Sequence, residues 1–458
     1  MHPTDLETPS APFRLDPHFL ASVIGAAGDR DGPLLRRLLI ALHPADLADV
    51  LEMLPGDSLR HVVRLIGQEL NPEFLPELVM EKREAVLALL PADYVSRALS
   101  ELDTDDAALV ASDMEEERLE EVLAAAPDDV RAAVESGLSF DEETAGRLMQ
   151  REFVAAPEFW TVGQTIDHLR AMADALPDRF YEIYVVDPAF RPIGSAALST
   201  MLREPRERPL AQLMVPMQFL ARPEMDQEEV AFAFQRYHLV SAPVVDNAGR
   251  LTGMMTVEDI VTVIQEEGTE DLLKLSGVTG AGMADSVLRS MRSRLPWLLL
   301  NLFTALTASS VIAGFEGSIQ KLVALAVLMP IVASLGGNAG TQTLAISVRA
   351  IAARDLTTFN ASRFVGREVL TGALNGLLVA LLLGSVAGFW FRSAGLALAI
   401  GLAVFANLTC AGLIGALVPL GLRRMGADPA VASSVFVTWA TDLIGFLSFL
   451  GLATWILL

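Results

Sequence analysis

The last third of the chain is marked by long apolar runs that contain no charged side chain. Four such runs, and a fifth that holds a single acid, lie between residues 297 and 458. Each is near or above the ~20 apolar residues that a helix needs to cross a lipid bilayer. The pattern predicts five transmembrane helices, at Trp297–Phe315, Leu322–Val348, Val369–Phe391, Ser393–Leu422 and Pro429–Leu458.

The first third follows a different pattern, in which a short polar motif precedes each apolar helical stretch. Proline suits the first turn of a helix, and acids are favoured at a helix N-terminus. Short helices that repeat in this way predict a small α-superhelix, whose acids are mostly helix starts and solvated surface. The motif recurs within residues 30–137 at His43–Asp46, Leu54–Asp57, Leu90–Asp93, Asp103–Asp106 and Ala126–Asp129.

Short β-strands replace the helical pattern from about Thr144. Two of them, Phe180–Val186 and Ala242–Val245, end in the same Val-Val-Asp sequence. Each is followed by a second strand, Pro192–Leu198 or Arg250–Thr256, and then by a helix. The same order appears twice, about 60 residues apart. The sequence therefore predicts a duplicated α/β module.

The charge is distributed unevenly along the 458 residues, which are 52% hydrophobic with a mean hydropathy of +0.42. Residues 291–458 hold ten Lys+Arg and five Asp+Glu, whereas residues 1–290 hold 24 and 52. The chain therefore combines a membrane part with a strongly acidic soluble part. The soluble part should attract cations. It excludes nucleic-acid binding, because that requires Lys and Arg against the phosphates.

Three further features narrow the function. The single cysteine, Cys410, lies in an apolar run, which excludes an intrachain disulfide and argues against a cysteine metal site. The N-terminus has no basic region followed by an apolar stretch, so we expect no secretory signal. The predicted spans hold no His cluster, Gly-rich phosphate loop or Ser/His/Asp arrangement. We therefore expect that the protein is not an enzyme.

Lysine and arginine in the connections between the predicted spans indicate the orientation. Eight lie on the side of the acidic soluble part and two on the other side. This places the N-terminal part in the cytoplasm and the C-terminus outside. Because five is an odd number of spans, a symmetric pore is more readily built by two copies of the chain. The eight are Arg292, Arg294, Arg349, Arg354, Arg363, Arg367, Arg423 and Arg424, and the two are Lys321 and Arg392.

Asp442 is the only charged residue between Asp428 and the C-terminus, and it lies well inside the last predicted span. A charged side chain at the centre of a membrane helix costs roughly 2.5–3.5 kcal/mol on insertion scales. Such groups usually face a water-filled path or a partner. A cation pathway is therefore the first hypothesis. The alternative is a helix–helix hydrogen bond, for which Thr441, Thr438 and Asn407 are candidate partners.

The second predicted span contains Pro330 and the glycine-rich segment Gly336–Thr343. Proline removes a helix hydrogen bond and glycine loosens the turns after it, which predicts a broken helix. Broken membrane helices occur where they line a cavity, and their polar groups can face an ion. Asn338, Thr341 and Gln342 cluster beside the predicted break. The alternative is a helix-packing face, because small residues let helices approach closely.

Several segments together resemble the MgtE family of magnesium channels, from about residue 30 to the end. The Gly-Gly-Asn-Ala-Gly segment after a proline and the Thr-Asp pair in the last span are specific to that family. The duplicated module is similar to a pair of CBS domains, which many unrelated proteins share. Other matching segments are Thr144–Met149, Gly253–Asp259 and an acidic turn at Glu266–Asp271.

The resemblance implies a homodimer that has a central pore and lies in the cell inner membrane, where its transmembrane helices contact lipid. It implies a mostly α membrane protein, in which a cytoplasmic α-superhelix and an α/β CBS pair are attached to a five-helix transmembrane domain. The expected segments are a disordered tail at 1–29, an acidic superhelix at 30–140, CBS domains at 141–203 and 204–266, a connecting plug helix at 267–291 and the transmembrane domain at 292–458.

In that family an acid of the last span, contributed by both protomers, forms the ion site of the pore. Asp442 occupies this position. The resemblance implies that Asn338, Thr341, Gln342 and Thr438 help to line the site, although some relatives carry Asn where this chain has Thr341. Mg²⁺ sheds its water reluctantly and prefers octahedral oxygen coordination. Two facing carboxylates would therefore bind the hydrated ion during import.

Charge and resemblance together predict that intracellular Mg²⁺ closes the channel. Two bare carboxylates ~4 Å apart repel by roughly 4 kcal/mol at an effective dielectric near 20, and bound Mg²⁺ would bridge them. Relatives often carry an acid where this chain has His238, so one regulatory site is expected to be weaker here. The candidate regulatory residues are Asp259, Glu266, Glu267, Glu270, Asp271, Asp105 and Asp106.

ATP is a candidate modulator. CBS pairs often bind adenine nucleotides through an Asp that follows a Gly-x-x-Thr-x-x-Asp pattern and binds the ribose. Asp259 ends such a pattern, which makes it the candidate nucleotide-binding residue, whereas the first module has Thr200 at the corresponding place.

Three other readings stay open. A CBS-regulated anion channel predicts basic groups in the pore, whereas the acid within the last span is negative. A membrane-anchored sensor would conduct nothing, which a flux measurement distinguishes. Co²⁺, Mn²⁺ or Ni²⁺ are alternative substrates, since a carboxylate site discriminates weakly among divalent ions, although no His or Cys lies near Asp442 to favour softer metals.

Overall fold

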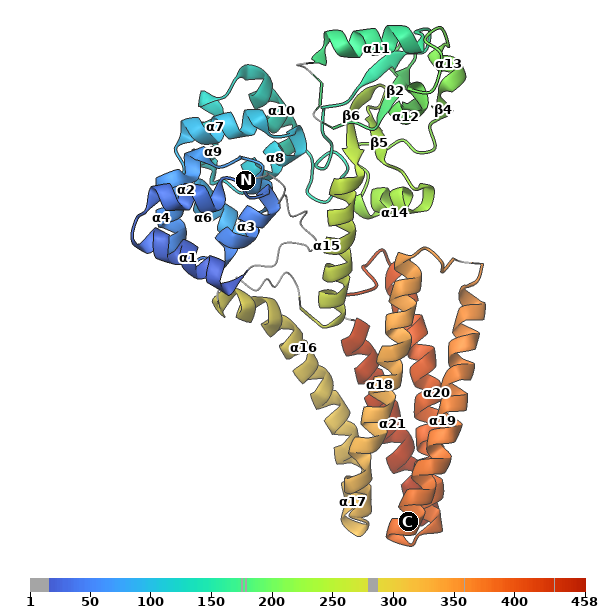
Figure 1. Ribbon diagram of the computed structural model, residues 1–458. Helices are drawn as coiled ribbons and strands as arrows, with labels where there is room; N and C mark the ends of the chain where they lie inside the picture. Colours follow the sequence, from blue (N-terminus) through green and yellow to red (C-terminus); the bar gives the residue numbers. More distant parts are fainter. Residues whose placement is uncertain (1–15, 174–175, 178, 279–286, 358, 432) are drawn as a thin grey trace, which may run out of the picture. The chain divides into compact units, whose positions relative to one another are not determined.

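The computed structural model describes residues 16–173, 176–177, 179–278, 287–357, 359–431 and 433–458. The chain divides into two compact units, Met1–Ile264 and Gln265–Leu458. The first unit contains a helical domain and an α/β domain, and the second contains the long apolar helices (Figure 1).

The helical domain consists of short helices whose apolar faces enclose one core. Five of the helices begin at the predicted polar motifs, which confirms those helix starts. Their bounds are α1 Pro17–Gly28, α2 Gly32–Leu39, α3 Pro44–Met53, α4 Gly56–Ile66, the 3₁₀ turn η1 Gly67–Glu69, α5 Phe74–Glu77, α6 Met80–Leu87, α7 Ala92–Glu101, α8 Thr104–Ser112, α9 Glu116–Ala125 and α10 Asp128–Leu138.

The tail predicted for residues 1–29 is wrong over its second half, because α1 occupies Pro17–Gly28. Asp16 caps this helix by accepting a hydrogen bond from the His18 amide at 2.9 Å, and Val23 and Ala27 are fully buried in the core. The first 15 residues lie outside the described residues. The apolar face of α1 therefore belongs to the helical domain.

The α/β domain contains two small sheets. One has the order β1-β2-β3-β4, in which β1 and β2 are parallel and the other neighbours antiparallel, and the second is the antiparallel pair β5-β6. Three hydrophobic clusters fill the space between strands and helices. The bounds are β1 Ala155–Pro157, α11 Val162–Ala171, β2 Glu182–Val186, β3 Pro192–Ala197, α12 Leu198–Met201, α13 Leu210–Leu213, β4 Val215–Pro216, α14 Gln227–Tyr237, β5 Ser241–Val245, β6 Leu251–Thr256 and α15 Val257–Leu275.

The predicted duplication is confirmed in backbone detail. The β2–β3 pair and the β5–β6 pair each shift register at the second valine of the Val-Val-Asp sequence. Asp187 then accepts hydrogen bonds from the amides two and four residues ahead, at 2.8 and 2.9 Å. Asp246 does the same at 2.8 Å in both cases. The aspartate therefore closes both turns in the same way.

The acidic segment Glu266–Asp271 is not a turn, which corrects the prediction from sequence. It continues α15, which begins directly after β6 and runs to Leu275. Gly268 has no atom within contact distance of its missing side chain, so this glycine is not required by a turn. The plug helix expected at 267–291 is therefore in part an extension of the second CBS helix, and residues 279–286 lie outside the described residues.

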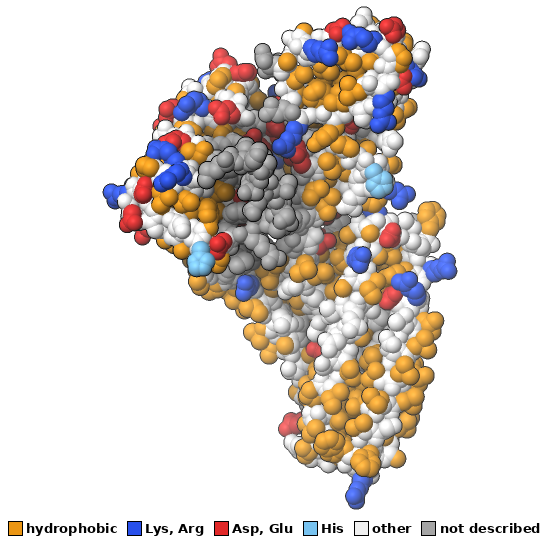
Figure 2. Space-filling view, viewed as in Figure 1, with side chains coloured by type: hydrophobic (Ala, Val, Ile, Leu, Met, Phe, Trp, Pro, Cys, Tyr) orange, Lys and Arg blue, Asp and Glu red, His pale blue; other side chains and the backbone are white. Residues whose placement is uncertain are grey.

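Five helices of the second unit are long and apolar enough to cross a membrane, as predicted. Helix α20 is the most enclosed: 44% of its apolar window is buried, against 11% for α16 and α19. The sides of the bundle are mostly hydrophobic, and charged side chains gather towards its two ends (Figure 2). The bounds are α16 Val287–Gly314, the short helix α17 Glu316–Lys321, α18 Ala324–Ala352, α19 Ala361–Phe391, α20 Ala394–Arg424 and α21 Ser433–Leu457.

The break predicted in the second span is not found, because α18 is continuous from Ala324 to Ala352 with Pro330 inside it. The glycines serve close packing instead. A methyl group added at Gly340 would lie 2.5 Å from Val437 Cγ1 on α21. A methyl group at Gly336 would lie 2.8 Å from Asn407 Cγ on α20. The packing alternative therefore accounts for these two glycines.

Candidate functional site

Asp442 is the half-buried acid of α21, and none of the described residues gives it a hydrogen bond or an ion pair. Two of the three side chains considered as partners make other hydrogen bonds. The Thr441 hydroxyl donates to the Val437 and Thr438 carbonyls at 3.0 and 2.9 Å. The Asn407 amide donates to the Val332 carbonyl at 3.0 Å. The helix–helix hydrogen bond offered as the alternative is therefore absent from the described part of the chain.

The polar residues of α18 lie on one exposed face of that helix. Asn338, Thr341 and Gln342 are all exposed in the single chain, and the Thr341 hydroxyl donates to the Gly337 carbonyl at 2.9 Å. A methyl group added at Gly337 would lie 3.8 Å from Thr438 Cγ2 on α21. The structure therefore brings Thr438 beside the segment that carries the polar face.

One carboxylate with amide and hydroxyl oxygens is the ligand set of a hard cation, and Mg²⁺ usually keeps several of its waters. Among the described residues, no three His, Cys, Asp or Glu side chains lie close enough to hold a metal ion by themselves. A single chain therefore offers one carboxylate, Asp442, together with neutral oxygen groups on the facing part of α18. Contact through bound water is the chemistry that this arrangement supports.

A second group of acids forms where the helical domain meets the α/β domain. Asp105 and Asp106 begin α8, and Asp259 lies in the first turn of α15. Burial raises the pKa of Asp105 well above its ordinary range, and the charges of Asp259 and Asp106 raise it further. Burial, with the charges of Asp259 and Asp103, raises the pKa of Asp106 to about 7. The charges of these three carboxylates therefore oppose one another, which makes ionisation of Asp105 and Asp106 unfavourable, although no three described acids lie close enough together to hold a metal ion by themselves.

The positions of these acids are fixed by local hydrogen bonds. Thr256 donates to Asp259 through its amide at 3.3 Å and its hydroxyl at 2.5 Å; burial raises the pKa of Asp259 although these bonds lower it. Glu152 of the α/β domain accepts from the Thr104 amide at 3.2 Å and hydroxyl at 2.5 Å, at the start of α8. The buried Asp105 Oδ1 has no hydrogen-bond partner in the described part. Because this oxygen is buried near other acidic groups, a bound cation would stabilise its negative charge.

The raised pKa values predict a pH dependence for the metal-free protein. The folded contact binds more protons than the unfolded chain, so its stability should fall as the pH rises from the ordinary Asp pKa towards 7. In EDTA, the free energy of unfolding of the soluble part is expected to decrease by about 1–3 kcal/mol between pH 5.5 and 7.5. Thermal unfolding of the full-length protein in detergent measures this difference.

Asp106→Asn should flatten that pH dependence, because the group that titrates near pH 7 is gone. Asp49→Asn is the matched control, since Asp49 is an exposed acid on α3 of the same domain. It should leave the slope unchanged. A metal-free protein that becomes more stable as the pH rises through this window would contradict the assignment.

A third charged group lies within the second unit. The Lys274 ammonium on α15 bridges Glu270 at 2.8 Å and Asp428, in the connection between α20 and α21, at 3.0 Å. Burial lowers the pKa of Lys274, but its hydrogen bonds to these two acids raise it more. Burial raises the pKa of Asp271, and the charge of Asp428 adds to this effect. Lys274 thus ties the end of α15 to the α20–α21 connection.

The seven predicted regulatory acids are therefore divided between places. Asp105, Asp106 and Asp259 come together, Glu270 and Asp271 join Asp428, and Glu266 and Glu267 lie one turn earlier on α15. Asp259, also the predicted nucleotide-binding residue, accepts hydrogen bonds from Thr256, and its charge raises the pKa of both acids of α8. Sequence reasoning missed Glu152, Lys274 and Asp428. Only Lys274 left a local signal, its i,i+4 spacing from Glu270.

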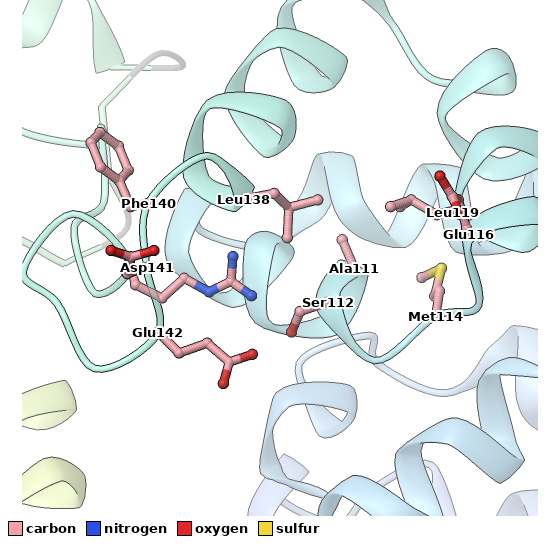
Figure 3. Close-up of a pocket in the computed structure, with 10 residues that line it drawn as sticks. Ala111, Ser112, Met114, Glu116, Leu119, Leu138, Phe140, Asp141 and Glu142 are labelled. Atoms are coloured by element: carbon pink, nitrogen blue, oxygen red, sulfur yellow. The ribbon is translucent and has the colours of Figure 1, made fainter.

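One cavity of about 430 Å³ lies in the first unit, away from these groups (Figure 3). It is lined by the end of α8, by α9 and by the segment after α10. Its side chains are of mixed character, with Glu116, Asp141 and Glu142 beside apolar groups and Arg147. Burial lowers the pKa of Arg147. The cavity offers no set of convergent donors for a particular ligand.

Comparison with known families matches three parts of the chain. Residues 329–452 match the MgtE family, described as a divalent cation transporter. Residues 42–143 match the MgtE intracellular N domain, and residues 210–266 match the CBS domain. Five membrane-crossing helices after an intracellular domain make the chain a multi-pass membrane protein whose N-terminal part is cytoplasmic.

Individual relatives extend over nearly the whole chain. The magnesium transporter MgtE of Thermus thermophilus is 33% identical over 440 residues, which cover 93% of this chain and 96% of that protein. The magnesium transporter MgtE of Enterococcus faecalis is 33% identical over 317 residues, covering 69% and 70%. A crystal structure of the cytosolic domain of the Mg²⁺ channel MgtE in complex with ATP is 32% identical, with a TM-score of 0.49, and covers 53% of this chain and 99% of that one. The chain belongs to the MgtE family of magnesium transporters.

Proposed function

We propose that two copies of the chain form a channel that imports Mg²⁺ across the cytoplasmic membrane. The observation that carries the proposal is the Asp442 carboxylate, half-buried in a membrane helix without a hydrogen bond or ion pair in the described part of the chain. A charge at this depth is costly unless something compensates it. A hydrated Mg²⁺ between the Asp442 carboxylates of two copies supplies that compensation.

The polar face of α18 supports the same proposal. Asn338, Thr341 and Gln342 are exposed in one chain although they lie in a membrane span. Polar side chains in a membrane face a partner or a water-filled path. Their amide and hydroxyl oxygens, with Thr438 on α21, can accept hydrogen bonds from the water around the ion. This outer-sphere contact suits Mg²⁺, which dehydrates reluctantly. The C-terminus lies outside in this arrangement, as the distribution of Lys and Arg predicts.

We propose further that cytoplasmic Mg²⁺ closes the channel through the acid groups. Without metal, Asp105, Asp106 and Asp259 repel one another across the contact between the helical and α/β domains. A divalent ion that binds there stabilises the contact by mass action. Asp271 and Asp428 offer a second pair, which Lys274 already neutralises in part. Because binding favours the compact state, high cytoplasmic Mg²⁺ reduces flux. ATP is a candidate modulator because the sequence Gly253–Asp259 has the pattern that binds ribose in other CBS pairs.

Flux through the purified protein tests the proposal. Full-length protein in liposomes, with a Mg²⁺ indicator inside, should admit Mg²⁺ faster than protein-free liposomes. Millimolar Mg²⁺ on the side of the cytoplasmic part should suppress this flux, and EDTA on that side should restore it. Co²⁺ and Mn²⁺, added as competitors, show how far the site prefers Mg²⁺. Folded protein that passes no divalent ion in EDTA would favour the non-conducting sensor instead.

A further inference from the structure

One polar side chain is fully buried at the meeting point of three membrane helices. Asn407 lies on the enclosed face of α20, where every other buried residue is apolar or glycine. Its amide nitrogen donates to the Val332 carbonyl of α18 at 3.0 Å. Its side-chain oxygen is buried and has no hydrogen-bond partner in the described residues. A buried polar group that is only partly satisfied destabilises the fold, so its presence here needs an explanation.

Two glycines on neighbouring helices leave the space that the Asn407 side chain occupies. A methyl group added at Gly336 on α18 would lie 2.8 Å from Asn407 Cγ and 2.9 Å from Oδ1. A methyl group added at Gly445 on α21 would lie 2.7 Å from Asn407 Nδ2. Contacts this short are not tolerated between packed atoms. The amide therefore occupies the space that side chains at 336 and 445 would need, and it joins α18, α20 and α21.

The contact of Asn407 with α18 and α21 lies close to the proposed ion site along each of these two helices. Gly445 follows Asp442 by three residues, which is about 4.5 Å of helix. Gly336 precedes Asn338 by two residues, and Val332 lies in the turn after Pro330. The hydrogen bond from Asn407 therefore holds α18 at the level where its polar face begins. A shift of either helix around this contact moves Asp442 relative to Asn338.

We infer that Asn407 is a positioning residue for the ion path, which fixes the spacing and rotation of α18 against α21. The inference rests on the proposed function, because it concerns how the Asp442 site is held. Asn407 does not itself contact the ion, since it is 0% exposed. Its hydrogen bond to Val332 and its fit against Gly336 and Gly445 together define one arrangement of the three helices. The competing explanation is that Asn407 merely fills space.

A double-substitution cycle separates the two explanations, with Mg²⁺ flux in liposomes and thermal unfolding in detergent as readouts. Asn407→Ala and Gly336→Ala alone should each lower flux by roughly tenfold and lower the unfolding temperature by about 5 °C. In the double variant, the methyl at 336 occupies space that the amide leaves. Stability should then recover to near wild type while flux stays low, because the hydrogen bond to Val332 is still missing.

Flux that returns to the wild-type level in the double variant would overturn the inference, as would unchanged flux in Asn407→Ala. Asn407→Asp, measured at low pH, is the second variant, should the alanine variants not fold: its carboxyl is close to the amide in size, and in its protonated form it keeps one donor. Its flux should lie within about threefold of wild type, and a loss as large as in Asn407→Ala counts against positioning. Ser347→Ala is the control, because Ser347 is fully buried but bonds within α18 at 2.7 Å. Absence of flux in the wild type would instead refute the proposed function.

Discussion

Asp442→Asn is expected to reduce Mg²⁺ flux by roughly 100-fold or more, because the attraction between a carboxylate and a divalent ion in a low-dielectric site is worth several kcal/mol. The variant should nevertheless fold. An uncompensated charge within a membrane helix costs roughly 2.5–3.5 kcal/mol and an amide costs less, so its unfolding temperature should equal or exceed that of the wild type. Liposome flux with the Mg²⁺ indicator, and thermal unfolding in detergent, measure the two effects on one preparation.

The matched control is Glu316→Gln, which removes an acid from the short helix α17, outside the membrane spans. Its flux should stay within about twofold of wild type, because an exposed charge far from the site contributes little at physiological salt. Wild-type flux in Asp442→Asn would refute the assignment of the pore acid. Flux lost together with stability would indicate a structural role for Asp442, which also contradicts the proposal.

In the proposed function the two kinds of acid have different roles, and their arrangements are opposite. Asp442 has no hydrogen bond or ion pair in the described part of the chain, so in the proposal a passing cation finds a favourable site there that a second copy of the chain completes. Asp105, Asp106 and Asp259 instead influence one another electrostatically, so in the proposal a bound cation changes the free energy of the contact between the helical and α/β domains. The first arrangement is suited to conduction and the second to sensing. Both use oxygen ligands, which suit a hard divalent ion.

Much of the fold follows from local patterns in the sequence. A run without charges is a sufficient signal for a membrane helix, and all five predicted spans are helices. Proline and acid at helix starts predicted where α3 and α8 begin, because these residues act within one turn. The Val-Val-Asp sequence predicted both strand turns, since the Asp187 carboxylate closes its turn through neighbouring amides. Such features depend on interactions over a few residues.

The errors have the opposite origin, because they depend on contacts far apart in the sequence. Gly336 was taken as a helix breaker, but it is small because Asn407, 71 residues later, lies against it. The bridge from Lys274 to Asp428 joins a helix to a connection that follows four membrane spans. Glu152 and Thr104 meet across two domains. No periodicity or local motif marks these pairs before the chain has folded.

The seven acids that the sequence predicts to be regulatory illustrate the same limit. Their charge alone gave no reason to prefer one acid over another as a metal ligand. The structure distinguishes Asp105, which is buried and has an oxygen without a hydrogen-bond partner in the described residues, from Glu266, which is exposed. The difference arises from Glu152 and Thr104, whose hydrogen bonds hold the start of α8 against the α/β domain. The sequence therefore predicted candidate residues by type alone, whereas burial at the start of α8 distinguishes individual acids among them.

Asp105→Asn is expected to shift two measurements in opposite directions. In EDTA it should raise the stability of the domain contact, because the neutral amide replaces a carboxyl that must take up a proton to be buried beside Asp259 and Asp106. In Mg²⁺ it should weaken the response, because one anionic ligand is lost. The Mg²⁺ concentration that half-protects residues 1–290 of the full-length protein from protease should rise about tenfold. The cytoplasmic Mg²⁺ concentration that halves the flux should likewise be higher than in the wild type.

Higher stability in EDTA together with a weaker response to Mg²⁺ would distinguish a sensing role of Asp105 from a purely structural one. A residue that only stabilises the fold would shift both measurements the same way, since lost stability increases cleavage with or without metal. Asp49→Asn, on the exposed face of α3, should leave both measurements unchanged and so controls for net charge. If Asp105→Asn leaves the Mg²⁺ midpoint where it is in the wild type, the contact between α8 and Asp259 is not the sensor. The bridge of Asp428 to Lys274 would then be the remaining place for cytoplasmic Mg²⁺ to act.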